Sequence, residues 1–103
     1  MFSRRDRYPR SLFSAAHKNG IRRSSEHFRV IIPHEGRGYA VVIPKKVIKS
    51  AVGRHKLKRT VFSLLRELPR PTALIVFPKA EATGVHYQDL KTELIELLSP
   101  FTS

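Results

Sequence analysis

Two segments of the chain carry apolar residues at the spacing of a helix. In residues 51–68 an apolar residue recurs every three or four positions, which places these side chains on one helical face. That stripe consists of Leu57, Val61, Leu64, Leu65 and Leu68. Pro69 and Pro71 follow and end the helix, because proline lacks an amide hydrogen. Residues 87–98 predict a second helix, with Tyr87, Leu90, Leu94, Leu97 and Leu98 on its apolar side and Asp89, Glu93 and Glu96 outside.

Three short runs rich in β-branched and other apolar residues predict strands. They are FRVIIP at 28–33, YAVVIP at 39–44 and ALIVFP at 73–78. The linker at 34–38 (HEGRG) is rich in turn-forming residues, so we expect the first two strands to form a hairpin. A short helix is expected at residues 11–17, with Ser11 as its N-cap and Gly20 as its end.

These elements predict one α+β domain spanning residues 1–103, because a second core does not fit in a chain of this length. The expected architecture is a two-layer sandwich with helices on one face of a small sheet. The strands at 39–44 and 73–78 flank a helix, so in a shared sheet they would be parallel, with the usual right-handed crossover. The first ten residues carry Arg4, Arg5, Arg7 and Arg10 without an apolar block. We interpret them as a flexible basic arm rather than a secretory signal or an organelle transit peptide.

The net charge narrows the range of functions. The chain has 20 Lys and Arg against 8 Asp and Glu, a formal charge of +12 with His counted neutral. Residues 1–80 contribute +15 and residues 81–103 contribute −3. The positive side chains repel one another, and a polyanionic partner would screen this repulsion, so such a charge favours a partner of that kind. The absence of Cys excludes disulfides and thiolate chemistry and fits a cytoplasmic location. No apolar run approaches the roughly 20 residues of a membrane span.

Residues 45–59 hold a dense cluster of basic side chains and no acidic residue. Its members are Lys45, Lys46, Lys49, Arg54, His55, Lys56, Lys58 and Arg59. A solvated helix face is the ordinary explanation of a charge run, but such faces usually mix both signs, and no acid follows until Glu67. Cations at the start of a helix oppose its macrodipole unless an anion binds there. We therefore predict contact with nucleic-acid phosphates at this segment.

Helical spacing divides these cations into two rows. Arg54 and Lys58 are four residues apart and share a face, whereas Lys56 and Arg59 form a neighbouring pair. Arg54 is the best candidate for a bidentate contact to phosphate or a base edge, because its guanidinium is planar and always charged. His55 can donate a hydrogen bond or stack.

The sequence predicts neither a catalytic site nor a metal site in the protein. The five histidines form no His-x₃-His pair. Glu93 and Glu96 lie three residues apart, but we expect them on the solvated face of the acidic helix. Gly36 and Gly38 indicate a turn rather than a phosphate-binding loop, and nothing predicts a small-molecule substrate or a membrane partner.

The basic segment resembles the signature of the bacterial ribonuclease P protein subunit. The run KKVIKSAVGRHKLKR at 45–59, followed by LLRE at 64–67, is similar to that family's Lys-Lys pair, Arg-Asn-Arg motif, Lys-Arg pair and later Leu-Arg-Glu. His55 stands at the position of the Asn, and Lys56 at that of the second Arg. The flanking segments are also similar, so the resemblance covers about residues 10–98. His17 stands where the family's first helix carries a second aromatic residue.

The resemblance implies both a fold and a function. The fold would be an α/β sandwich with a small mixed sheet, in the order αβββαβα, with the basic helix in an unusual left-handed crossover. The family protein binds a catalytic RNA through the basic helix and the single-stranded 5′ leader of precursor tRNA in a cleft between the sheet and the first helix. The RNA performs the hydrolysis with Mg²⁺, held mainly by the RNA. The chain would then be a non-catalytic subunit of this endoribonuclease in tRNA 5′ maturation.

A single-stranded leader stacks on aromatic rings and runs along cations. Phe13 and Phe28 are candidates for stacking, and His17 offers a weaker surface, although the ordinary place of a Phe side chain is the core. A ribosomal or general RNA-binding protein without an enzyme role is the alternative, and a basic DNA-binding protein is a third. The basic motif followed by LLRE and a further strand separates ribonuclease P from the first alternative, and the DNA-binding alternative predicts equal affinity for duplex DNA.

Overall fold

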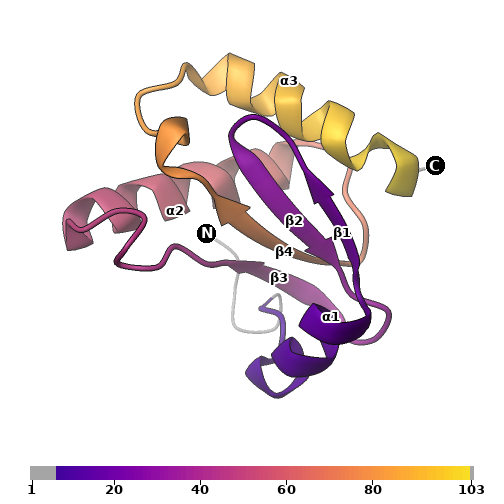
Figure 1. The fold of residues 1–103 in the computed structure, drawn as a ribbon. Helices are drawn as coiled ribbons and strands as arrows, with labels where there is room; N and C mark the ends of the chain where they lie inside the picture. The colour runs from indigo at the N-terminus through magenta and orange to yellow at the C-terminus, as the bar shows by residue number, and fades with distance from the viewer. Residues whose placement is uncertain (1–6, 103) are drawn as a thin grey trace.

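The computed structural model describes residues 7–102 as one four-stranded mixed sheet with helices on both faces (Figure 1). The main elements in chain order are α1 (Phe13–Asn19), β1 (Ile21–Ser24), β2 (Phe28–Ile32), β3 (Gly38–Val41), α2 (Ala51–Glu67), β4 (Ala73–Pro78) and α3 (Tyr87–Leu98). Three short 3₁₀ helices are η2 (Arg10–Leu12), η3 (Ala80–Ala82) and η4 (Ser99–Phe101). The expected α+β class and the order αβββαβα are confirmed.

Strand β4 lies inside the sheet, whose order is β1-β2-β4-β3. It runs antiparallel to β2 and parallel to β3. The predicted hairpin between residues 28–33 and 39–44 is therefore wrong, because β4 separates these strands and β2 forms its hairpin with β1 instead. Five of the six β4 residues are buried, which is typical of a strand covered on both faces. The parallel pairing of the two strands that flank α2 is confirmed, and the hand of the crossover stays a prediction.

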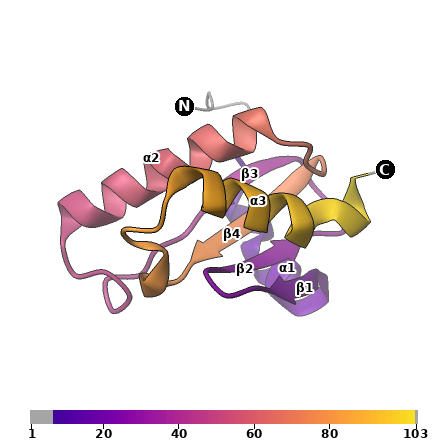
Figure 2. The same cartoon turned by 90° about the horizontal axis from the view of Figure 1, so that it is seen from above.

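Helices α2 and α3 cover one face of the sheet (Figure 2). All five residues of the predicted α2 stripe are buried. They pack with Phe28, Val30 and Val76 from the sheet and with the apolar side of α3 in the main core. Ser50 caps α2, because its hydroxyl accepts a hydrogen bond from the Gly53 amide at 3.1 Å. The stripe thus fixes α2 on the sheet and turns the remaining helix surface to solvent.

Helix α1 lies on the opposite face, so the expectation of helices on one face only is wrong. Ala16 of α1 packs with Ile31 and Ile75 in a second, smaller core. Alternation along the strands explains this core, since Ile31 of β2 and Ile75 of β4 lie between residues of the main core and point to the opposite face. A Cβ atom at Gly20 would lie 2.6 Å from Ile31 Cγ2, so glycine allows α1 to end close to the sheet. The predicted Ser11 cap is not observed, because Ser11 lies within η2.

The segment before α1 is part of the fold from residue 7 onward. Tyr8 is 4% exposed, its amide donates to Tyr39 O at 3.1 Å, and its hydroxyl donates to Glu35 O at 2.8 Å. Gly36, with φ of +89°, passes so close that a Cβ there would lie 2.6 Å from Leu12 Cδ1. The expected flexible arm at 1–10 therefore does not hold for residues 7–10, and residues 1–6 lie outside the described part of the chain.

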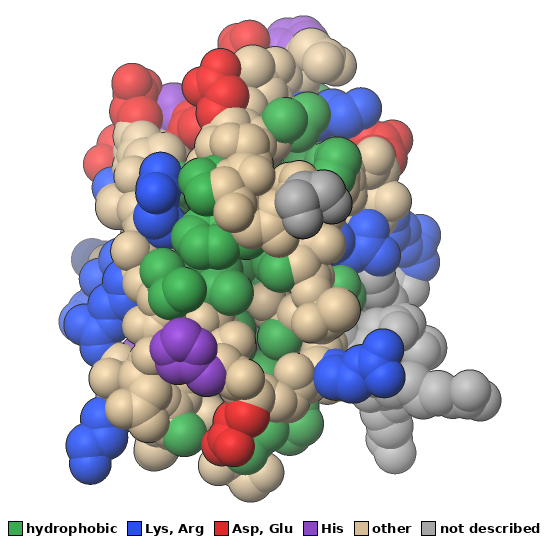
Figure 3. Space-filling view, turned by 90° about the vertical axis from the view of Figure 1, so that its right-hand side faces the viewer, with side chains coloured by type: hydrophobic (Ala, Val, Ile, Leu, Met, Phe, Trp, Pro, Cys, Tyr) green, Lys and Arg blue, Asp and Glu red, His purple; other side chains and the backbone are tan. Residues whose placement is uncertain are grey.

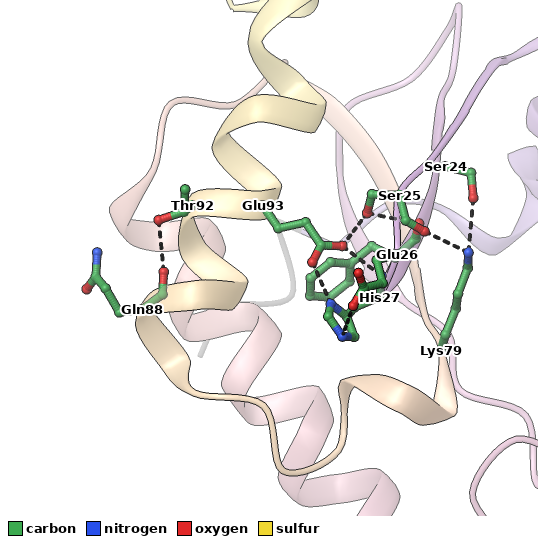
Figure 4. Close-up of polar contacts among 9 residues, drawn as sticks. Ser24, Ser25, Glu26, His27, Lys79, Gln88, Thr92 and Glu93 are labelled. Carbon is green, nitrogen blue, oxygen red and sulfur yellow. Dashed lines mark hydrogen bonds and ion pairs between the residues drawn. The ribbon is translucent and has the colours of Figure 1, made fainter.

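A half-buried carboxylate on α3 holds the β1–β2 turn (Figure 4). Glu93 accepts hydrogen bonds from the Ser25 hydroxyl, from the His27 amide at 2.7 Å and from His27 Nδ1 at 2.6 Å. The second ring nitrogen of His27 lies 3.2 Å from Glu26. Lys79 supports the same turn by donating to Ser25 O at 2.7 Å. The expectation that Glu93 faces solvent is therefore wrong, because only Glu96 of that pair is exposed.

The contacts between Glu93 and His27 shift the pKa of each residue in the direction that stabilises its charged form. The hydrogen bond to Glu93 raises the pKa of His27 above its usual 6.5, against the opposing effect of burial. Burial alone would raise the pKa of Glu93, but hydrogen bonds from Ser25 and His27 lower it below its usual 4.5. The His27 contribution to stability is complete below pH 6.5 and is lost as the pH rises through the raised pKa of the folded state. The Glu93 contribution is complete above pH 4.5 and is lost as the pH falls through its lowered pKa.

Substitution Glu93→Gln therefore tests this pair through the pH dependence of unfolding. We expect the stability difference between the wild type and this variant to be largest between pH 4.5 and 6.5 and to shrink on either side. Urea unfolding measured from pH 3 to pH 9 checks this. A difference that stays constant over that range would contradict it. Glu96→Gln, at an exposed position of the same helix, is the control and should show no such peak.

Truncation of Leu64 tests the buried stripe of α2. Leu64 is fully buried, so Leu64→Ala should lower the free energy of unfolding by about 2–5 kcal/mol. Val52→Ala on the same helix removes a side chain that is 77% exposed and should change it by no more than about 0.5 kcal/mol. Denaturant titration of both variants measures the difference. Equal effects would mean that the faces of α2 are assigned wrongly.

Candidate nucleic-acid interface

The predicted basic residues lie together on the first half of α2 and on the turn that precedes it. Lys45, Lys46 and Lys49 are exposed on the turn, and Lys56, Lys58 and Arg59 are exposed on the helix. Arg54 is half-buried and His55 is exposed. The residues of each expected row lie together: Arg54 and Lys58 line one hollow with Ile43. Lys56 and Arg59 line another with Val52.

No ion pair neutralises this cluster within residues 7–102. The described ion pairs involve His27 with Glu26 and Glu93, and Lys91 with Glu67. Helix α3 contacts the other half of α2, where Tyr87 OH donates to Glu67 at 3.0 Å. On the face seen in Figure 3, acidic side chains gather at the top, where α3 lies, and most Lys and Arg side chains lie at the two sides. The acidic helix is thus kept away from the basic half of α2, as its composition predicts.

Arg54 makes contacts that its sequence position did not indicate. Its Nη1 donates to Ile48 O at 2.9 Å and to Lys49 O at 2.8 Å. One nitrogen of the guanidinium is therefore occupied by the chain itself. Arg54 differs in burial from Lys56, Lys58 and Arg59, which are exposed on the same helix.

A cleft of about 770 Å³ lies beside the basic rows. The N-terminal segment and α1 form one wall, β3 and the residues that follow it form the floor, and α2 forms the other wall. Its lining residues are Arg7, Tyr8, Arg10, Phe13, Tyr39, Ala40, Val41, Val42, Ile43, His55, Lys58, Arg59 and Phe62. Cations thus stand on both walls of a groove that contains aromatic rings.

Of the three aromatic or ring candidates, only Phe13 lines this cleft. Its ring lies 5.8 Å from that of Tyr8. Phe28 is fully buried in the main core on the opposite face of the sheet, so its candidacy as a stacking surface is withdrawn. His17 is exposed on α1, where its ring lies 5.7 Å from that of Phe77, outside the lining of the cleft.

Sequence reasoning missed several residues of the cleft. Arg7, Tyr8 and Arg10 were assigned to a flexible arm, and Tyr39 was read only as the start of a strand. Tyr39 is held by its hydroxyl, which donates to Pro71 O at 2.8 Å, and by Arg70, whose guanidinium lies 5.1 Å from the ring centroid. Phe62 had a usable signal, because it follows Lys58 by four residues and so shares the face of the inner basic row.

The structural features agree with two comparisons with known proteins, one with protein-family models and one with solved structures. A family model described as Ribonuclease P matches residues 5–102. No curated protein gives a significant sequence match. No helix within residues 7–102 is long and apolar enough to cross a membrane.

Solved structures with a similar fold include RNase P proteins from two bacteria. The RNase P protein from Thermotoga maritima superposes with a TM-score of 0.78 at 26% identity, over 96% of this chain and 100% of that one. The RNase P protein of Staphylococcus aureus gives a TM-score of 0.69 at 20% identity, over 89% of this chain and 90% of that one. The family match favours ribonuclease P over a ribosomal or DNA-binding protein. The chain therefore belongs to the ribonuclease P family and is a protein subunit of that bacterial tRNA-processing ribonucleoprotein.

Proposed function

We propose that the chain binds the catalytic RNA of ribonuclease P through the basic turn and α2, and holds the 5′ leader of precursor tRNA in the cleft. The exposed cations of the turn and helix support the first contact, because no described acidic side chain competes for them. Phosphates would gain from these side chains and from the positive end of the helix dipole. The family assignment supports the RNA component of ribonuclease P as this partner.

The composition of the cleft is the observation that carries the second contact. A single strand exposes bases that stack on aromatic rings and a backbone that cations neutralise. Phe13 and Tyr39 offer rings, and Arg10 and Lys58 offer charge on opposite walls. A duplex has no unstacked bases to place there, so the arrangement suits the leader rather than the acceptor stem of the tRNA.

Hydrolysis belongs to the RNA in this proposal, with Mg²⁺ held mainly by the RNA. Within residues 7–102 no group of three His, Asp or Glu side chains lies close enough together to hold a metal ion. The described residues therefore do not fit a magnesium site made by the protein alone. The chain contributes cations and stacking surfaces that position the substrate.

Reconstitution tests the partnership with RNA. We expect the chain, mixed with the ribonuclease P RNA of the same organism, to increase cleavage of precursor tRNA at low Mg²⁺, where bound cations replace part of the metal's charge screening. Cleavage of a labelled precursor is followed with and without protein. Failure to stimulate cleavage at any protein concentration that saturates the RNA would refute the proposed function.

Substitution Phe13→Ala tests the site of the leader. Loss of one stacking ring should weaken binding of a precursor that carries a leader by about 1–3 kcal/mol, and it should not change binding of mature tRNA, which has none. Binding to the reconstituted complex is measured for both RNAs. Phe101→Ala, which removes a half-buried ring outside the cleft, should change neither affinity. Equal weakening of both RNAs by Phe13→Ala would place the leader elsewhere.

A further inference from the structure

The turn before α2 carries three of the cluster's lysines on a short stretch of non-helical chain. Pro44 O accepts hydrogen bonds from the amides of Val47 at 3.0 Å and Ile48 at 3.3 Å, which closes the turn. Lys45 and Lys46 project from it as exposed side chains, and Lys49 follows. Neither hydrogen bond involves the backbone of Lys49, and residues 45–49 contain no helix or strand.

Arg54 joins this turn to the helix. Residues 48 and 49 precede the helix, and their carbonyl groups point to the Arg54 guanidinium, whose Nη1 contacts both. Hydrogen bonds from a charged donor are stronger than those between neutral groups. The contact also directs the charge of Arg54 toward carbonyl oxygens and so offsets part of its unfavourable position in the first turns of α2.

Packing beneath the turn restricts the conformations that the turn can adopt. Ile48 is half-buried against the main core, and a Cβ atom at Gly53 would lie 3.2 Å from its Cγ2. Gly53 thus lets the turn approach the helix closely, and the next residue, Arg54, ties the backbone of the turn to that helix. The Ser50 cap completes the junction.

We propose that Arg54 is a positioning residue: it fixes the turn, and with it Lys45, Lys46 and Lys49, in the geometry that binds the RNA backbone. The proposal rests on the proposed RNA-binding function of this surface. Arg54 then acts through the lysines and not as a phosphate ligand, which reverses the expectation from its position in the basic motif. A turn held in this way binds without first paying the entropy of ordering its side chains.

Two measurements on the full-length chain distinguish Arg54 as a positioning residue from Arg54 as a phosphate ligand. In the free protein, Arg54→Ala should make the amides of Val47 and Ile48 exchange with solvent at least about tenfold faster, because the turn loses its external hydrogen bonds. With the ribonuclease P RNA, the same variant should bind about tenfold more weakly, while the slope of log affinity against log salt stays at the wild-type value. The lysines still neutralise the same phosphates, but from a disordered turn.

Arg59→Ala is the matched control, since Arg59 is exposed on the same helix. It should leave the exchange of Val47 and Ile48 unchanged and reduce the salt slope by about one unit, as expected for a lost phosphate contact. Unchanged exchange in Arg54→Ala, or a slope reduced by about one unit, would overturn the positioning role. The exchange measurement needs no RNA, so it is independent of the proposed function, which fails instead if the wild-type chain does not bind the RNA.

A double-mutant cycle adds a test of coupling. If Arg54 acts through the turn, Lys46→Ala should weaken RNA binding less in the Arg54→Ala background than in the wild type. Additive effects of the two substitutions would contradict the proposal. Arg54→Lys should fall between wild type and Arg54→Ala in amide exchange, because an ammonium can donate to a carbonyl but lacks the planar fork of arginine.

Discussion

The burial of β4 on both faces is the constraint on which the rest of the molecule depends. Five of its six residues are buried, and they contribute to two separate cores, Leu74 and Val76 to one and Ala73 and Ile75 to the other. A strand of this kind needs a layer on each side, which α2 and α3 provide above and α1 with the N-terminal segment provides below. The nucleic-acid cleft lies where these two layers end, along the neighbouring strand β3.

Local patterns predicted the elements well, because each long element carries its own periodicity. Strand β4 and helix α3 have the predicted bounds, and α2 differs by one residue. The pairing of the strands was not predictable in the same way. The linker at 34–38 has the composition of a hairpin turn, yet β4, which follows much later in the chain, lies between β2 and β3 in the sheet. Strand β1 (IRRS) has no apolar alternation, since all four residues are exposed. The family order αβββαβα implied a third strand before α2, but its position at 21–24 was not predicted.

In the candidate site, too, features within one contiguous segment were predictable, whereas features assembled from distant segments were not. The cations of 45–59 were predictable because they are close together in the sequence, on one turn and the helix that follows it. The cleft was not, because Tyr8, Tyr39 and Phe62 come from three segments that only the sheet topology brings together. Phe28 was wrongly predicted as a candidate for stacking on RNA bases. The alternation of side chains along β2 places its ring in the main core instead. The role of Arg54 depends on backbone carbonyls, which a sequence does not display.

The loop at 33–37 has a consequence for engineering. Surface loops ordinarily tolerate insertions and fused tags, and this one lies at the surface with residues 34–37 exposed. Yet Tyr8 is hydrogen-bonded to Glu35 and Tyr39, on both sides of Gly36, so one wall of the cleft is anchored to this loop. A label inserted there would displace that wall. At the bend of Gly84 a Cβ atom would have no neighbour within 4 Å, but the φ of +84° there requires glycine. A fluorophore or an affinity tag is therefore better attached beside Gly84 than in its place.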